Sequence, residues 1–129
     1  MTVRLTIDRW TYYCCGMTPP PLREPSYFVL ASLLDEPLHG YAIIKQANEL
    51  SEGRVRMTAG TLYGALDRLA DEGLIEVERE EVVQGRPRRY YRLTGIGAER
   101  LSAEAARLSA SARVVADRLP VLKARLESA

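Results

Sequence analysis

The sequence predicts a mainly α-helical fold with one small β-hairpin, an α+β class, that ends in a long helix. Three observations support this prediction. Apolar residues recur at helical spacing between positions 27 and 73, alternate with charged residues from position 75, and return every three or four residues from position 101 onward. The chain has 129 residues, which is the length of one domain or of one domain with an additional segment.

Charge and composition limit the classes of function. The 18 basic and 17 acidic residues leave a net charge of +1, which excludes a uniformly basic surface but not a local basic patch. A structural zinc site needs four nitrogen or sulfur ligands, and the chain offers only Cys14, Cys15 and His39. No stretch is apolar enough for a membrane span or a signal peptide. We therefore expect a cytoplasmic protein without a metal or another cofactor.

Residues 1–24 differ in composition from the rest of the chain. They hold the only tryptophan and three consecutive prolines at positions 19–21, which keep a chain extended. We predict that residues 1–24 form an N-terminal extension, either disordered or the product of a start assigned upstream of Met17. The apolar alternation at positions 3, 5 and 7 leaves a docking arm open as the alternative.

The next part of the chain predicts two short helices. Tyr27, Leu30, Leu33 and Leu34 follow the spacing of one buried helical face, and Pro37 is expected to end this helix. A second helix is predicted to open at the run His39-Gly40-Tyr41 and to close at Gly53.

The third helix has the clearest start and stop signals. Thr58 can cap its N-terminus, and Gly73 suits the left-handed position at its end. Its apolar stripe is formed by Leu62, Leu66 and Leu69.

The face opposite this stripe suits contact with DNA. Gly60 and Gly64 would let the backbone approach a phosphate or a base edge, and Thr58 and Thr61 offer hydroxyl groups there. Relief of a crowded helix–helix contact is the alternative explanation for the two glycines.

From residue 75 the pattern predicts a hairpin. Ile75 and Val77 alternate with glutamates, a polar link follows over residues 80–88, and a second strand is expected over residues 89–93. Three helices followed by a hairpin are the order of a winged helix-turn-helix, whose third helix enters the major groove of DNA. We predict this DNA-binding domain over residues 25–94.

The hairpin sorts its charges. Residues 84–92 contain four arginines and no acid, whereas glutamates dominate residues 76–81. Arg86 and Arg88, beside Gly85 and Pro87, would project from the tip, where arginines suit phosphate or minor-groove contact. A solvated loop with salt bridges to its own acidic strand is the alternative.

The apolar pattern of residues 95–129 predicts a dimerisation helix. A 4-3 apolar repeat is typical of a coiled coil, and a single helix cannot bury such a seam without a partner. Pro120 is expected to kink or interrupt the helix. The predicted dimerisation residues are Leu101, Ala105, Leu108, Ala112, Val115, Leu119, Leu122 and Leu126.

Several motifs resemble those of the PadR family of transcriptional regulators. They are the runs PLHGYAI at 37–43, TLY at 61–63, EGLI at 72–75 and GRPRRYY at 85–91, in the order and spacing of that family. The resemblance covers residues 25–129. The chain is similar to the short branch of the family, which has one dimerisation helix.

The resemblance implies a homodimeric repressor that binds an inverted-repeat operator in double-stranded DNA, often near its own gene. It implies DNA contacts by Thr61 and Tyr63 of the third helix and by Arg86 and Arg88 of the hairpin, which forms the wing. It also implies a small aromatic or hydrophobic effector, although residues 96–129 lack the aromatic residue with which short members stack such a ligand. The predicted DNA-contacting residues are Thr58, Gly60, Thr61, Tyr63, Gly64, Arg86, Arg88 and Arg89.

The sequence leaves three other classes of function open. An enzyme would need His39 as its base, but this residue lies at a predicted helix entry, where capping and packing explain it better. A redox sensor would rest on the cysteine pair at positions 14 and 15, whose nearest basic residue in the sequence is Arg9. A winged-helix dimerising adaptor that works through protein contacts without DNA is the main alternative.

Overall fold

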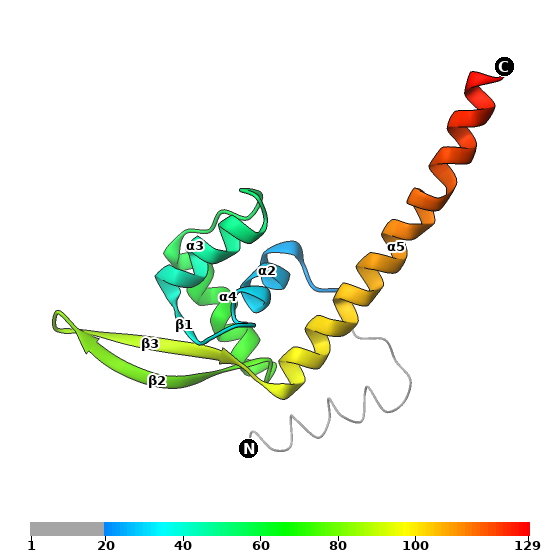
Figure 1. The fold of residues 1–129 in the computed structure, drawn as a ribbon. Coiled ribbons are helices and arrows are strands. Elements are labelled where there is room, and N and C mark those ends of the chain that lie inside the picture. The colour runs from blue at the N-terminus through cyan, green and yellow to red at the C-terminus, as the bar shows by residue number, and fades with distance from the viewer. Residues whose placement is uncertain (1–19) are drawn as a thin grey trace.

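The structure, a computed structural model, describes residues 20–129. Its elements are α2 (Glu24–Ser32), β1 (Leu38–His39), α3 (Gly40–Leu50), α4 (Ala59–Asp71), β2 (Ile75–Val83), β3 (Arg86–Leu93) and α5 (Gly95–Glu127) (Figure 1). The predicted α+β class, with helices and a small antiparallel sheet, is confirmed. The cysteine pair and the proposed docking arm lie outside the described residues.

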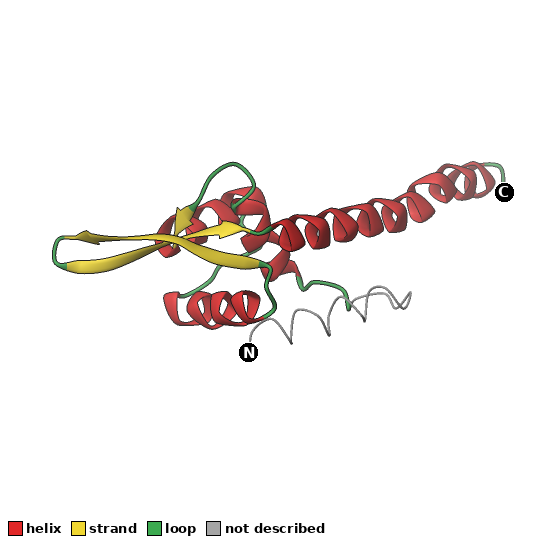
Figure 2. Ribbon diagram, turned by 90° about the horizontal axis from the view of Figure 1, so that it is seen from below, coloured by secondary structure: helices red, strands yellow, loops and turns green. Residues whose placement is uncertain are grey.

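The helices α2, α3 and α4 form a body from which two elements project. The hairpin of β2 and β3 extends from one side and α5 from the other, as both views show (Figures 1 and 2). The core lies where the helices meet the base of the hairpin and the first turns of α5. It consists of Val29, Leu30, Leu33, Ile43, Leu62, Leu66, Leu69, Leu74, Ile75, Tyr91 and Leu101.

The first helix is shorter than predicted. It ends at Ser32, where the Leu33 amide donates to the Leu30 carbonyl in a tight last turn. Leu34 lies beyond this end and is 61% exposed, so its assignment to the buried face was wrong. The buried Ser32 hydroxyl donates to the Val29 carbonyl at 2.6 Å, which helps to explain why the helix stops before Pro37.

Both predicted ends of α4 are confirmed. The Thr58 hydroxyl accepts a hydrogen bond from the Thr61 amide at 3.2 Å. At the other end Gly73 has a φ of 78°, and the Gly73 and Leu74 amides donate to the carbonyls of Ala70 and Leu69. This pair of bonds is the Schellman motif, which satisfies the last carbonyls of a helix.

The hairpin is longer than predicted. The strands reach Val83 and Arg86, so the predicted link over residues 80–88 reduces to Gln84 and Gly85, whose φ values are 51° and 76°. A two-residue turn with both φ values positive matches the twist of the strands. Pro87 pairs with Val82 inside the ladder. A proline is tolerated there because β1 covers β3 only at residues 90 and 91.

A third strand was not predicted. The two-residue strand β1 pairs Leu38 with Tyr91 and His39 with Tyr90, which gives the sheet order β1-β3-β2. On the other side of β3 a register shift between Val77 and Arg79 marks a bulge at Glu78. The bulge brings Arg79, rather than Glu78, opposite Tyr90.

The start of α5 is locked to the body. The Thr94 hydroxyl accepts from the Gly97 amide at 3.0 Å and donates to the Gly73 carbonyl at 2.6 Å. A Cβ atom at Gly97 would lie 2.0 Å from the Leu74 carbonyl oxygen, so only glycine allows this approach. The helix then continues through Pro120. The predicted interruption was wrong because the surroundings are exposed and water can bond the freed carbonyl.

The chain before α2 also contacts α5. An Arg100 guanidinium nitrogen donates to the Pro20 carbonyl at 2.6 Å. Glu104, only 6% exposed, is bonded to Arg107. Its pKa is lowered by this bond first, and also by a backbone bond from Leu22. Part of the predicted extension, residues 20–24, therefore contacts the folded body.

Candidate nucleic-acid interface

The outward face of α4 is open at both of its glycines. A Cβ atom added at Gly60 or Gly64 would meet nothing within 4 Å. Relief of a helix–helix contact within the described residues therefore does not explain them. Thr58 and Thr61 are exposed beside these glycines, and their hydroxyl groups lie 3.0 Å apart. The N-terminal half of α4 is thus a smooth surface with two hydroxyl groups and the positive end of the helix dipole.

The other half of α4 is less suited to an anion. Asp67 and Asp71 are exposed there, and the Arg68 guanidinium donates to the Ser26 hydroxyl at 3.0 Å. This bond ties Arg68 to α2. The helix is therefore polarised, with its anion-compatible surface at the N-terminal end.

Tyr63 connects α4 to the start of α3. Its ring is half exposed, and a Cβ atom at Gly40 would lie 2.8 Å from its hydroxyl oxygen. The absence of a side chain at Gly40 thus makes room for the phenol. Tyr41, next along the chain, is 75% exposed.

The hairpin of β2 and β3, the wing, carries four arginines on β3, and these four fall into two pairs. The Arg89 guanidinium bonds Glu80 at 2.9 Å, and that of Arg92 bonds Glu76 at 2.7 Å. Neither Arg86 nor Arg88 forms a salt bridge with any residue of the described chain. The alternative of a self-neutralised hairpin therefore applies to the half of the arginines nearer the body.

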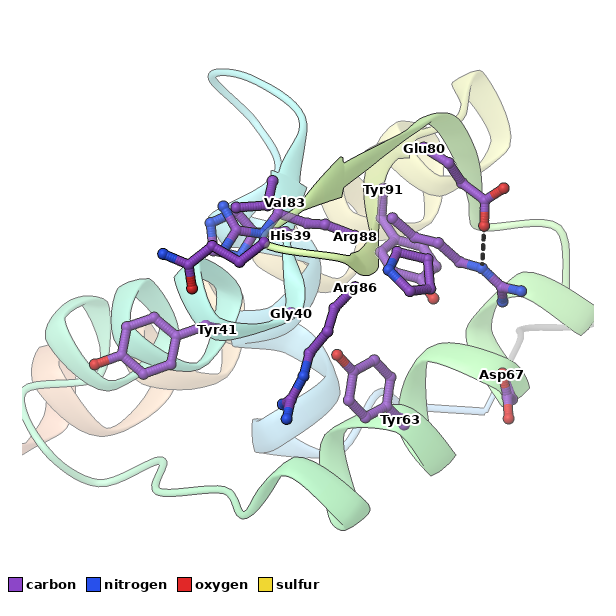
Figure 3. A pocket seen from close by; sticks show the side chains of 13 residues that line it. His39, Gly40, Tyr41, Tyr63, Asp67, Glu80, Val83, Arg86, Arg88 and Tyr91 are labelled. Atoms are coloured by element: carbon purple, nitrogen blue, oxygen red, sulfur yellow. Dashed lines mark hydrogen bonds and ion pairs between the residues drawn. The ribbon is translucent and has the colours of Figure 1, made fainter.

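A groove of about 660 Å³ separates the wing from α4 and the start of α3 (Figure 3). In this view Arg86 extends between Tyr63 and Tyr41 and lies closer to Tyr63. Asp67 and Glu80 add acidic groups. Its lining residues are His39, Gly40, Tyr41, Tyr63, Asp67, Glu80, Val83, Gln84, Arg86, Pro87, Arg88, Arg89 and Tyr91.

His39 packs into the base of the wing. Its ring meets that of Tyr90 edge-on at 5.5 Å between centroids, and the Arg79 guanidinium lies 4.0 Å from the centroid of Tyr90. Burial, and secondly the charge of Arg88, lower the pKa of His39 below its ordinary value. The imidazole is therefore neutral at neutral pH and acts as a packing group that joins β1 to the wing.

Sequence reasoning missed one exposed cation close to α4. Arg56 lies in the loop just before Thr58, and its guanidinium donates to the Gly53 carbonyl at 3.1 Å. A basic residue two positions before a helix cap was the signal that could have found it.

The predicted dimerisation residues fall into two groups, one on each side of Glu104. Leu101 is 5% exposed and lies in the core of its own domain. From Ala105 onward every residue of α5 is exposed, including Leu108, Val115, Leu119, Leu122 and Leu126. The apolar seam that residues 20–129 leave uncovered therefore starts at Ala105.

Two further features bear on the class of protein. Within residues 20–129 no group of three or more metal-ligating side chains occurs, and none of the helices there is long and apolar enough to cross a membrane. A short helix pair, an exposed third helix and an arginine-bearing hairpin define a winged helix-turn-helix of the kind found in DNA-binding regulators.

Comparison with known proteins gives the family. The model of the PadR-like family of transcriptional regulators matches residues 29–103, more than half of the chain. The chain belongs to this family. Transcriptional regulator Rv3488 of Mycobacterium tuberculosis is 38% identical over 87 residues, which are 67% of this chain and 78% of that protein.

Solved structures agree. A PadR family regulator from Clostridium difficile R20291 has a TM-score of 0.64 at 25% identity, covering 75% of this chain and 99% of that chain. Bacillus subtilis PadR, solved in complex with operator DNA, has a TM-score of 0.56 at 27% identity and covers 63% of this chain and 47% of that chain.

Proposed function

We propose that this PadR family regulator binds an inverted-repeat operator in double-stranded DNA as a homodimer and represses its own or a neighbouring operon. The observation that carries the proposal is the division of the wing arginines. Arg89 and Arg92 form salt bridges with glutamates, whereas Arg86 and Arg88 form none within the described chain. Arg86 and Arg88 also line the groove beside α4, where their charges can contact a ligand. Unpaired arginines beside a recognition-type helix suit DNA phosphates.

The exposed glycines of α4 support close approach of a partner. A glycine inside a helix costs about 0.5–1 kcal/mol relative to alanine, and nothing in the described chain requires Gly60 or Gly64. Approach of the helix backbone to base edges or phosphates accounts for both. Thr58, Thr61 and Tyr63 would then supply the polar groups of this contact.

The homodimer rests on the exposed seam of α5. Seven apolar seam positions from Ala105 to Leu126 have no cover within the described chain. A twofold dimer would bury them and present two recognition helices to the two halves of an inverted repeat. Release of the operator by a small aromatic or hydrophobic compound completes the proposal.

The test is binding to the DNA upstream of the protein's own gene, titrated at several salt concentrations. We expect tight binding to a palindrome with a steep salt dependence, and compounds can then be screened for release. Replacing Arg86 and Arg88 together by alanine removes four arginines from the homodimer, so it should lower the slope of log affinity against log salt by about four.

Arg92→Ala is the matched control because its charge is already held by Glu76. It should change the slope by less than about half a unit. Weak binding, equal for every DNA and insensitive to Arg86 and Arg88, would instead favour the protein-binding adaptor.

A further inference from the structure

The loop between α3 and α4, residues 51–58, is fixed by specific contacts although it has no regular secondary structure. Ser51 and Val55 are buried, and the Val55 amide donates to the Ser51 hydroxyl at 2.8 Å. The Asn48 side chain donates to the Val55 carbonyl at 3.3 Å, which joins the loop to the last turn of α3. Because both its buried residues and its polar groups are held, the loop presents its exposed side chains from a rigid support.

The two arginines of this loop have different partners. Arg54 and Arg56 flank the buried Val55, and both are exposed. The Arg54 guanidinium bonds Glu24 of α2 at 2.6 Å and lies 5.9 Å from the centroid of the Phe28 ring. Arg56 forms no salt bridge with any of residues 20–129. The loop therefore carries one paired cation and one cation whose charge is available to a ligand.

The side chain of Arg56 is positioned before any ligand arrives. Its Nε atom donates to the Gly53 carbonyl at 3.1 Å within the same loop. This bond uses one donor of the guanidinium and leaves the terminal nitrogens to bond another group. An arginine that is already held in place loses less side-chain entropy when it binds.

We propose that Arg56 binds a phosphate of the operator backbone and forms a second DNA contact, separate from the wing. The inference rests on the proposed function and adds a contact residue to it. Arg56 lies two residues before Thr58, which caps α4, so it stands at the end of α4 that is assigned to DNA. No residue of the loop lines the groove between the wing and α4.

Two separate phosphate contacts have a defined use. Phosphate contacts fix the position and orientation of a protein on the duplex, whereas base contacts read the sequence. The guanidinium group suits a phosphate because it can donate two parallel hydrogen bonds. With Arg86 and Arg88 on the wing and Arg56 in the loop, α4 would be held against the backbone at two places rather than one.

The test is replacement of Arg56 by alanine in the full chain, followed by titration with operator DNA at several salt concentrations. The homodimer loses two arginines, so the slope of log affinity against log salt should fall by about two. Affinities for operator and for unrelated DNA should fall by a similar factor, because a phosphate contact carries no sequence information. An unchanged slope would overturn the proposal.

Arg54→Ala is the matched control, since it removes the same charge from the same loop. Its guanidinium is already paired with Glu24, so the slope should change by less than about half a unit. Equal losses of slope in the two variants would show an effect of net charge rather than a contact, and would refute the role of Arg56.

Arg56→Lys separates a phosphate contact from support of the loop. Lysine keeps the positive charge, so this variant should retain the slope within about half a unit. Thermal unfolding of all three variants verifies that they are folded. A slope that falls as far in Arg56→Lys as in Arg56→Ala would assign Arg56 to the loop structure and contradict the proposal.

The unaltered protein distinguishes failure of this inference from failure of the proposed function. Absence of salt-dependent binding to any palindrome would refute both. Salt-dependent binding that weakens on replacement of Arg86 and Arg88, but keeps its slope in Arg56→Ala, would leave the proposed function intact and refute only the second contact.

Discussion

Gly97 and Gly64 have different surroundings, and these surroundings indicate different roles for the two glycines. Gly97 and Gly64 are both helical, yet an added methyl group would strike the Leu74 carbonyl at the first and open space at the second. The same substitution should therefore have opposite effects on stability. The pair separates a glycine kept for packing from a glycine kept for a ligand.

Gly64→Ala should raise the free energy of unfolding by about 0.5–1 kcal/mol, because alanine is the better helix former. It should also weaken operator binding, since the methyl group projects from the face assigned to DNA. Thermal unfolding and a DNA titration of the same preparation measure both effects. An unchanged affinity would show that the α4 backbone does not approach DNA at this position.

Gly97→Ala should lower the free energy of unfolding by several kcal/mol, because the Cβ atom forces α5 away from Leu74 and the Thr94 contacts with it. Gly95→Ala is the matched control, since nothing lies within 4 Å of a Cβ atom there. Chemical denaturation compares the two variants, and equal stability would contradict the close approach.

His39 should make stability depend on pH below neutrality. Its pKa in the folded protein lies below the ordinary value, so the unfolded chain binds the proton more readily. The free energy of unfolding should rise with pH between the folded pKa and about 6.5, and His39 should contribute no slope above that value. His39→Gln should remove this slope in denaturation curves, and an unaltered slope would assign it elsewhere.

At the scale of elements, the sequence predicted the features that depend on residues near one another in the chain. The Thr58 cap, the stop at Gly73 and the change of period at Ile75 each depend on neighbouring residues, and all three appear in the structure. The elements that were missed depend on distant partners. The strand β1 exists only because β3 passes beside Leu38 and His39.

The candidate site shows the same division. The arginines of the wing were visible in the sequence, but the ladder alone assigns Glu80 to Arg89 and Glu76 to Arg92. The bulge at Glu78 shifts that ladder by one residue and has no sequence signal of its own. The separation into paired and unpaired arginines is therefore a tertiary property.

Thr58→Ala should lower the free energy of unfolding by about 1 kcal/mol, because the Thr61 amide loses its capping acceptor. Thr58→Ser keeps the hydroxyl and should recover most of this loss. Thermal unfolding distinguishes the two, and equal losses would mean that the methyl group of Thr58, rather than its hydroxyl, stabilises the helix.

At the scale of the whole molecule, assembly and folding should be separable. Replacing Leu119 and Leu122 together by aspartate should give a folded monomer, because neither side chain contacts the domain core. Affinity for a palindrome should fall at least about a hundredfold, while weak binding to a half-site persists. Val121→Asp, exposed but outside the seam, is the control.

The junction at Thr94 has a mechanical consequence. One residue separates β3 from α5, and its hydroxyl bonds both helix α5 and the end of α4. In the proposed complex, where α4 contacts DNA and α5 forms the dimer, these two helices therefore move as one rigid unit. Such a dimer should bind only operators whose two halves have one fixed spacing. Inserting half a helical turn, about five base pairs, between the operator halves should abolish binding. The rigid unit of α4 and α5 cannot be rotated to the opposite face of the duplex.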